Sequence, residues 1–159
     1  MSQNDNVVTA GDLRGMALFA DLEDERLETV AAVARFSEAT TGALLLGEGE
    51  PADTVRVIVK GRVSLTIGLP GKGDVTVTTL SKGHLLGWSA LIPGSRWVAS
   101  AHALKPCLMV EIPAVELLDL CEKDFELGYR LMKNALVAVA ERLSETRLLV
   151  LDMYGAAGE

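Results

Sequence analysis

The sequence predicts a mainly β domain, an antiparallel β-roll or jelly roll, with flanking α-helices at its two ends. Two observations lead to this prediction. Between residues 40 and 112, apolar residues recur with a period of two, in short runs separated by glycine-containing turns. Before and after this region they recur at helical spacing. A chain of 159 residues, 49% of them hydrophobic, can bury one core. We therefore expect a flexible tail over residues 1–11 and a single domain over residues 12–159.

The N-terminal helical region is expected between Asp12 and Phe36. Apolar residues recur there at intervals of about three and four, which is typical of helices that pack on a core. The acidic stretch 21–25 divides the region into two helices, because negative charges favour the first turn of a helix.

The strands of the roll are expected from Thr40 onward. The turn-forming clusters 47–53 and 69–74 and the single residue Gly61 separate segments of alternating polarity. Strands this short, with turns at near-regular intervals, are typical of an antiparallel roll. The expected strands are residues 44–46, 55–60, 62–67, 75–79, 98–103 and 108–112.

Two helices are expected after the last strand. Pro113 suits the first turn of a helix that continues from Ala114 to Cys121. Asp124 is placed to cap a long C-terminal helix that extends to about Tyr154.

The long helix carries a narrow apolar seam with alternating spacings of three and four, which is typical of a coiled coil. We expect this seam to pair with a second copy of the chain and form a homodimer; the alternative is that the monomer buries it entirely. The seam residues are Leu136, Val139, Leu143, Thr146, Val150 and Met153.

The stretch 83–98 is the strongest candidate for a binding site. Gly87 lets the backbone approach a ligand closely, and Ser89, Ala90 and Leu91 can begin a helical turn whose free N–H groups favour an anion. Arg96 can add a permanently charged forked donor. This combination predicts a phosphate cradle, and a turn before a short helix is the alternative interpretation.

Gly87, Ala90, Leu91 and Arg96 also resemble the phosphate-binding cassette of cyclic-nucleotide-binding domains, the sensor domains of the catabolite-activator and Fnr superfamily. Segments 42–49 and 57–63 resemble the first signature of that family, so the resemblance extends from about Leu18 to about Met153. It implies a β-roll that senses a cyclic nucleotide and signals through its C-terminal helix to a dimer mate or an unknown effector protein.

The sequence departs from the family cassette at two places. Trp88 stands where the family has the glutamate that holds the ribose hydroxyl, and it could stack on a flat ligand or fill the ribose space. Trp97-Val98 replaces the family Ser/Thr-Ala after the arginine, and Trp97 either belongs to the site or packs at its lip. Three hypotheses follow: a sensor of a cyclic nucleotide held by its phosphate, a sensor of another small anion, or a protein-interaction module with a vestigial pocket.

Composition excludes several other classes of function. A net charge of −7 argues against a nucleic-acid or anionic-membrane partner, and no apolar run is long enough for membrane insertion. The two cysteines are far apart and, like the two histidines, lack metal-ligand spacing, so we expect a cytoplasmic protein without a metal or other cofactor. The carboxylates Glu111, Glu116 and Asp119 have no catalytic partner in recognisable spacing, so we do not expect an enzyme.

Overall fold

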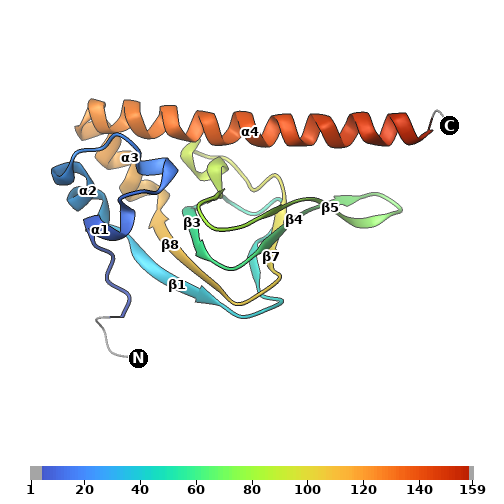
Figure 1. The fold of residues 1–159 in the computed structure, drawn as a ribbon, viewed down its shortest axis with the longest axis horizontal. Helices are drawn as coiled ribbons and strands as arrows, with labels where there is room; N and C mark the ends of the chain where they lie inside the picture. Colours follow the sequence, from blue (N-terminus) through green and yellow to red (C-terminus); the bar gives the residue numbers. More distant parts are fainter. Residues whose placement is uncertain (1–4, 158–159) are drawn as a thin grey trace.

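The computed structural model describes residues 5–157, and it confirms the predicted β-roll with flanking helices (Figure 1). Among these residues, eight strands form two antiparallel four-stranded sheets. The strand order is β1-β8-β3-β6 in one sheet and β2-β7-β4-β5 in the other. The strands are β1 (Arg35–Ala39), β2 (Leu44–Leu46), β3 (Thr54–Lys60), β4 (Val63–Leu69), β5 (Gly73–Leu80), β6 (Leu85–Leu86), β7 (Ser100–Ala103) and β8 (Cys107–Pro113).

Both sheets contribute to one hydrophobic core. Val57 of β3 lies opposite Val110 of β8 in the first sheet, and Leu65 of β4 lies opposite Ala101 of β7 in the second. All four side chains are buried in the same cluster. The far end of the β4–β5 hairpin extends beyond the roll (Figure 1), and its residues are exposed.

The N-terminal region is less helical than the sequence predicts. It contains α1 (Ala10–Leu13), the 3-10 turn η1 (Ala17–Phe19) and α2 (Asp24–Ala31). The predicted division of this region at the acidic stretch 21–25 is confirmed, because Asp24 and Glu25 occupy the first turn of α2. Thr9 and Asp12 form reciprocal cap bonds at the start of α1.

The prediction that the helical region continues to Phe36 is wrong, because the chain forms β1 there. Phe36 lies opposite Val110 on the neighbouring strand β8, and Arg35 forms an ion pair with Glu111 of the same strand. This long-range pairing outweighs the helical spacing of the preceding apolar residues.

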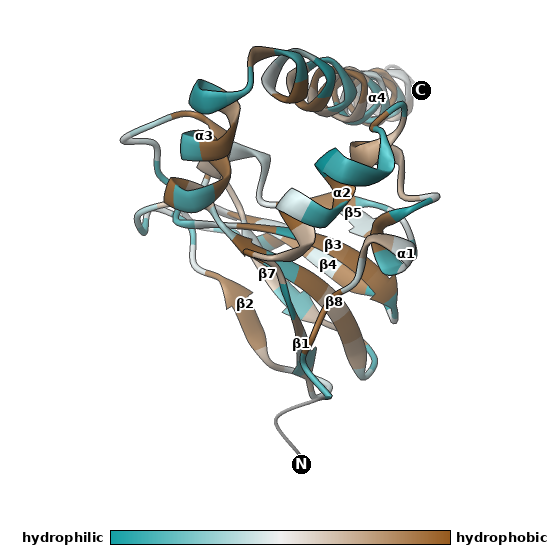
Figure 2. Cartoon of the chain, turned by 90° about the vertical axis from the view of Figure 1, so that its left-hand side faces the viewer, coloured by the Kyte–Doolittle hydropathy of each residue, from teal (hydrophilic) through white to brown (hydrophobic). Residues whose placement is uncertain are grey.

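The two C-terminal helices are confirmed. Pro113 precedes α3 (Ala114–Lys123), and Asp124 caps α4 (Phe125–Ala157) by accepting a 3.3 Å hydrogen bond from the Leu127 N–H. Figures 1 and 2 show α4 lying along one side of the roll, with hydrophobic strands beneath it. No helix within the described part of the chain is both long enough and apolar enough to span a membrane.

Candidate functional site

The predicted turn after the Gly87 bend is confirmed. β6 ends at Leu86; Gly87 follows with a left-handed φ of 89°, and the 3-10 turn η2 (Trp88–Leu91) begins directly after it. A Cβ atom on Gly87 would lie 2.8 Å from the Thr54 carbonyl oxygen and 3.0 Å from the Trp97 ring. Only glycine therefore allows β6, β3 and the indole to approach this closely. Ser89, Ala90 and Leu91, the other cassette residues, are buried.

Trp97 occupies the space in front of the cassette. It is only 6% exposed, and its ring contacts Gly87. The hollow that remains between Gly87, Trp88, Ser89 and Trp97 has a volume of about 30 Å³. A volume this small admits water but not a nucleotide.

Arg96 does not line this hollow. Its side chain is exposed, and its Nη1 atom donates a 2.8 Å hydrogen bond to the Gly49 carbonyl oxygen. The backbone of Trp97 joins the same two loops: its N–H donates to the Glu50 carbonyl oxygen, and its carbonyl oxygen accepts from the Gly49 N–H. In this conformation Arg96 links two loops, and its predicted role as an anion ligand stays a prediction.

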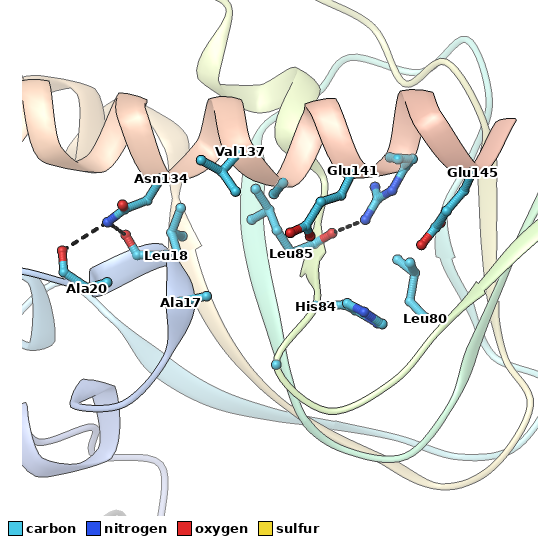
Figure 3. A pocket seen from close by; sticks show the side chains of 13 residues that line it. Ala17, Leu18, Ala20, Leu80, His84, Leu85, Asn134, Val137, Glu141 and Glu145 are labelled. Carbon is cyan, nitrogen blue, oxygen red and sulfur yellow. Dashed lines mark hydrogen bonds between the residues drawn. The ribbon is translucent and has the colours of Figure 1, made fainter. Parts of the chain in front are cut away.

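Arg142 of α4 lines the hollow, although sequence reasoning did not select it. Its Nη2 atom donates a 2.7 Å hydrogen bond to the Leu85 carbonyl oxygen of β6 (Figure 3). Its Nε atom is buried and has no hydrogen-bond partner within residues 5–157. Burial lowers the pKa of this guanidinium, against the opposite effect of Glu145. The signal in the sequence was an arginine on the α4 face that otherwise carries Leu131, Ala135 and Ala138.

Arg142 also lines a second cavity of about 340 Å³, which lies between η1, the β5–β6 connection and α4 (Figure 3). Asn134 closes one end by donating 3.0 Å hydrogen bonds to the Leu18 and Ala20 carbonyl oxygens. His84 lies at the other end, where its Nδ1 atom accepts a 2.9 Å hydrogen bond from the Ser81 N–H. Arg142 is thus a shared wall of the cassette hollow and this cavity.

The predicted apolar seam lies on the exposed side of α4. Leu136 is 67% exposed, Leu143 60% and Met153 66%, whereas Val139 and Thr146 are half-buried, so the described part of the monomer leaves most of the seam uncovered. The same spacing extends toward the start of the helix through three residues that the prediction missed. We define the α4 seam as Phe125, Tyr129, Met132, Leu136, Val139, Leu143, Thr146, Val150 and Met153.

Within residues 5–157, no group of three or more His, Cys, Asp or Glu side chains is arranged to hold a metal ion. Cys107 and Cys121 are buried free thiols. Burial raises the pKa of the Cys121 thiol, with further contributions from Asp124 and Glu122, which makes it less reactive.

A family profile described as "Cyclic nucleotide-binding domain" matches residues 36–124. A candidate cyclic nucleotide-binding protein from Geobacter metallireducens GS-15 is 31% identical, with a TM-score of 0.77, and the match covers 86% of this chain and 98% of that one. A cyclic nucleotide-binding domain from Methylobacillus flagellatus KT has the same fold, with 22% identity, a TM-score of 0.81 and coverages of 93% and 88%.

The curated relatives include longer proteins. An uncharacterized NTE family protein of Mycobacterium bovis is 26% identical over 136 residues, which are 85% of this chain and 22% of that protein. The chain thus spans about a fifth of the length of this relative.

Proposed function

The chain belongs to the cyclic nucleotide-binding domain family, and from this membership we propose that it is a ligand-sensing regulatory domain. A small anionic ligand binds at the cassette of Gly87, Trp88 and η2, and α4 passes the change to a second copy of the chain or to an effector protein. The role is regulatory and not catalytic. Differential affinity of the ligand for two positions of α4 would drive the signal.

The observation that carries this proposal is the double role of α4. The helix lines the cassette hollow through Arg142, and it carries the exposed α4 seam on another face. A ligand in the hollow therefore contacts α4, the same helix whose exposed seam is available to a partner. Because the seam has coiled-coil spacing along most of the helix, a second copy of the chain is the partner that fits it.

Thermal shift tests the sensing role. A ligand at one hundred times its dissociation constant stabilises a protein by about 2.7 kcal/mol, which raises the melting temperature of a domain this size by about 5–10 °C. Cyclic AMP, cyclic GMP, cyclic dinucleotides and phosphorylated metabolites are the compounds to test. If none of them raises the melting temperature, the sensing role is wrong.

A second function, a protein-interaction module without a ligand, is favoured by one observation. The hollow of about 30 Å³ between Trp88 and Trp97 is too small for a nucleotide in the described conformation. Under this alternative, the α4 seam still pairs with a partner, and no tested ligand changes that pairing. Sedimentation velocity with and without each ligand distinguishes the two functions.

A further inference from the structure

We infer that Arg142 of α4, and not Arg96 of the cassette, meets the negative charge of a ligand in the hollow. This inference rests on the proposed sensing function and names the residue through which it operates. The ligand class is a small molecule with an exposed phosphate or similar oxyanion.

The first argument is the state of the two guanidinium groups. Arg96 is exposed to solvent and already donates to the Gly49 carbonyl oxygen. Arg142 is half-buried, lines the hollow, and keeps its Nε–H buried without an acceptor among residues 5–157. A buried donor without an acceptor is costly, so an oxyanion in the hollow supplies the group that Arg142 lacks.

The second argument is charge. Arg142 has no ion pair with any described carboxylate, and its Nη2 donates only to the neutral carbonyl of Leu85. Glu145, one turn away, acts on it only at longer range and lowers the cost of burial in part. Buried charges in proteins are usually paired. An anion next to Ser89 and Gly87 would pair with this one directly.

The third argument concerns the signal. The hydrogen bond between Arg142 and Leu85 connects α4 to β6, immediately before the Gly87 bend. An oxyanion competes with the Leu85 carbonyl for the guanidinium, and charge-assisted hydrogen bonds are the stronger kind. Binding therefore weakens the hydrogen bond between Arg142 and Leu85, so the ligand acts directly on the attachment of α4 to β6.

The indole of Trp97 limits the ligand. Because the hollow is small, we expect an oxyanion that enters it to displace part of its lining, and the Trp97 ring that packs on Gly87 is the group we expect to move. A serine at this position would lack the ring and leave more of the hollow open. Trp97→Ser is therefore the background in which binding is strongest and in which the two arginines can be compared.

The experiment is calorimetric titration of the full chain with cyclic AMP and with inorganic phosphate. In the Trp97→Ser background, adding Arg142→Gln is expected to weaken binding about tenfold to a hundredfold, the effect of losing a charged hydrogen bond. The glutamine amide is two bonds shorter than the guanidinium and does not reach the Leu85 carbonyl oxygen, so the melting temperature of each variant is measured to verify that it is folded. Arg147→Gln is the matched control, since Arg147 is an exposed arginine on the same helix, and it is expected to leave the affinity within threefold.

The outcomes separate this inference from the proposed function. If Arg96→Gln abolishes binding and Arg142→Gln does not, the inference is wrong and the sensing function stands. If no variant binds either compound, the inference is wrong, and the thermal-shift test with the wider set of compounds decides the sensing function separately. A measurement on the unmodified chain does not depend on the folding of the Trp97→Ser variants. The ¹H–¹⁵N signal of the buried Arg142 Nε–H, identified by its absence in Arg142→Gln, is expected to shift with cyclic AMP, and an unchanged signal at saturation overturns the inference.

Discussion

Replacing Trp97 by serine tests whether the indole is both a part of the core and a barrier to the ligand. The side chain is 6% exposed and contacts Gly87. Truncation of a buried aromatic residue costs about 3–5 kcal/mol in the free energy of unfolding. For a domain of this size, that loss lowers the melting temperature by about 6–20 °C. Val98→Ser is the control, because its neighbouring side chain is 57% exposed, and it is expected to change stability by less than about 0.5 kcal/mol.

The same free energy enters the binding equilibrium. If a ligand has to displace the indole, the unmodified chain loses most of that stabilisation when it binds, and Trp97→Ser does not. A difference of about 3 kcal/mol corresponds to roughly a hundredfold in the dissociation constant. Differential scanning fluorimetry measures the destabilisation, and calorimetry with cyclic AMP measures the affinity. A variant that is destabilised as expected, but binds cyclic AMP no better than the unmodified chain, would refute the barrier role.

Three further predictions concern the partner helix, the Gly87 bend and a buried ion pair. Leu143→Glu on the α4 seam should convert a dimer into a monomer in sedimentation velocity, because pairing would bury an unpaired charge. Leu148→Glu, at a residue that is similarly exposed but lies off the seam, should leave the dimer intact. An unmodified chain that is monomeric would contradict this prediction. Gly87→Ala should lower the free energy of unfolding, measured in urea, by about 2 kcal/mol or more, since it adds a close contact with Thr54 to the cost of a left-handed φ. Gly71 has a similar φ with open space around it, so Gly71→Ala should lower that free energy by only about 1–2 kcal/mol. Equal losses in the two variants would argue against the contact with Thr54. Burial alone would raise the pKa of Glu111, but Arg35 and Arg56 outweigh it and hold that pKa below its ordinary value. The carboxylate therefore stabilises the fold above the pKa of unfolded glutamate, about 4.3, and this contribution disappears as the pH falls through the lower folded pKa. Glu111→Gln should flatten the acid side of the stability profile, and an unchanged acid slope would show that the pair contributes little.

The roll and its turns could be predicted because alternation and glycine positions are local signals. Pro113 and Asp124 likewise marked the starts of the two C-terminal helices, since their effects depend on adjacent backbone groups. The strand β1 could not be predicted, because Phe36 is strand only through its pairing with Val110, far along the chain. The direction of the Arg96 side chain depends on Gly49, which another loop supplies. Arg142 was missed for a similar reason: a sequence motif includes only neighbours along the chain, and this residue meets the cassette through the packing of α4.

Arg142 also lies where α4 loses its support from the roll. Before it, Leu127, Leu131 and Ala135 are buried against the domain; after it, all side chains from Arg147 to Ala156 are exposed. Most helical stability in proteins comes from the packing of an apolar face, so a partner at the seam would stabilise the second half of α4. A second copy that covers Leu143 and Val150 would stabilise this half directly after the residue that holds the helix on β6. Ligand at the cassette and partner at the seam would thus act on adjacent turns of one helix. By thermodynamic linkage, the factor by which the ligand changes the dimerisation constant equals the factor by which dimerisation changes the affinity for the ligand.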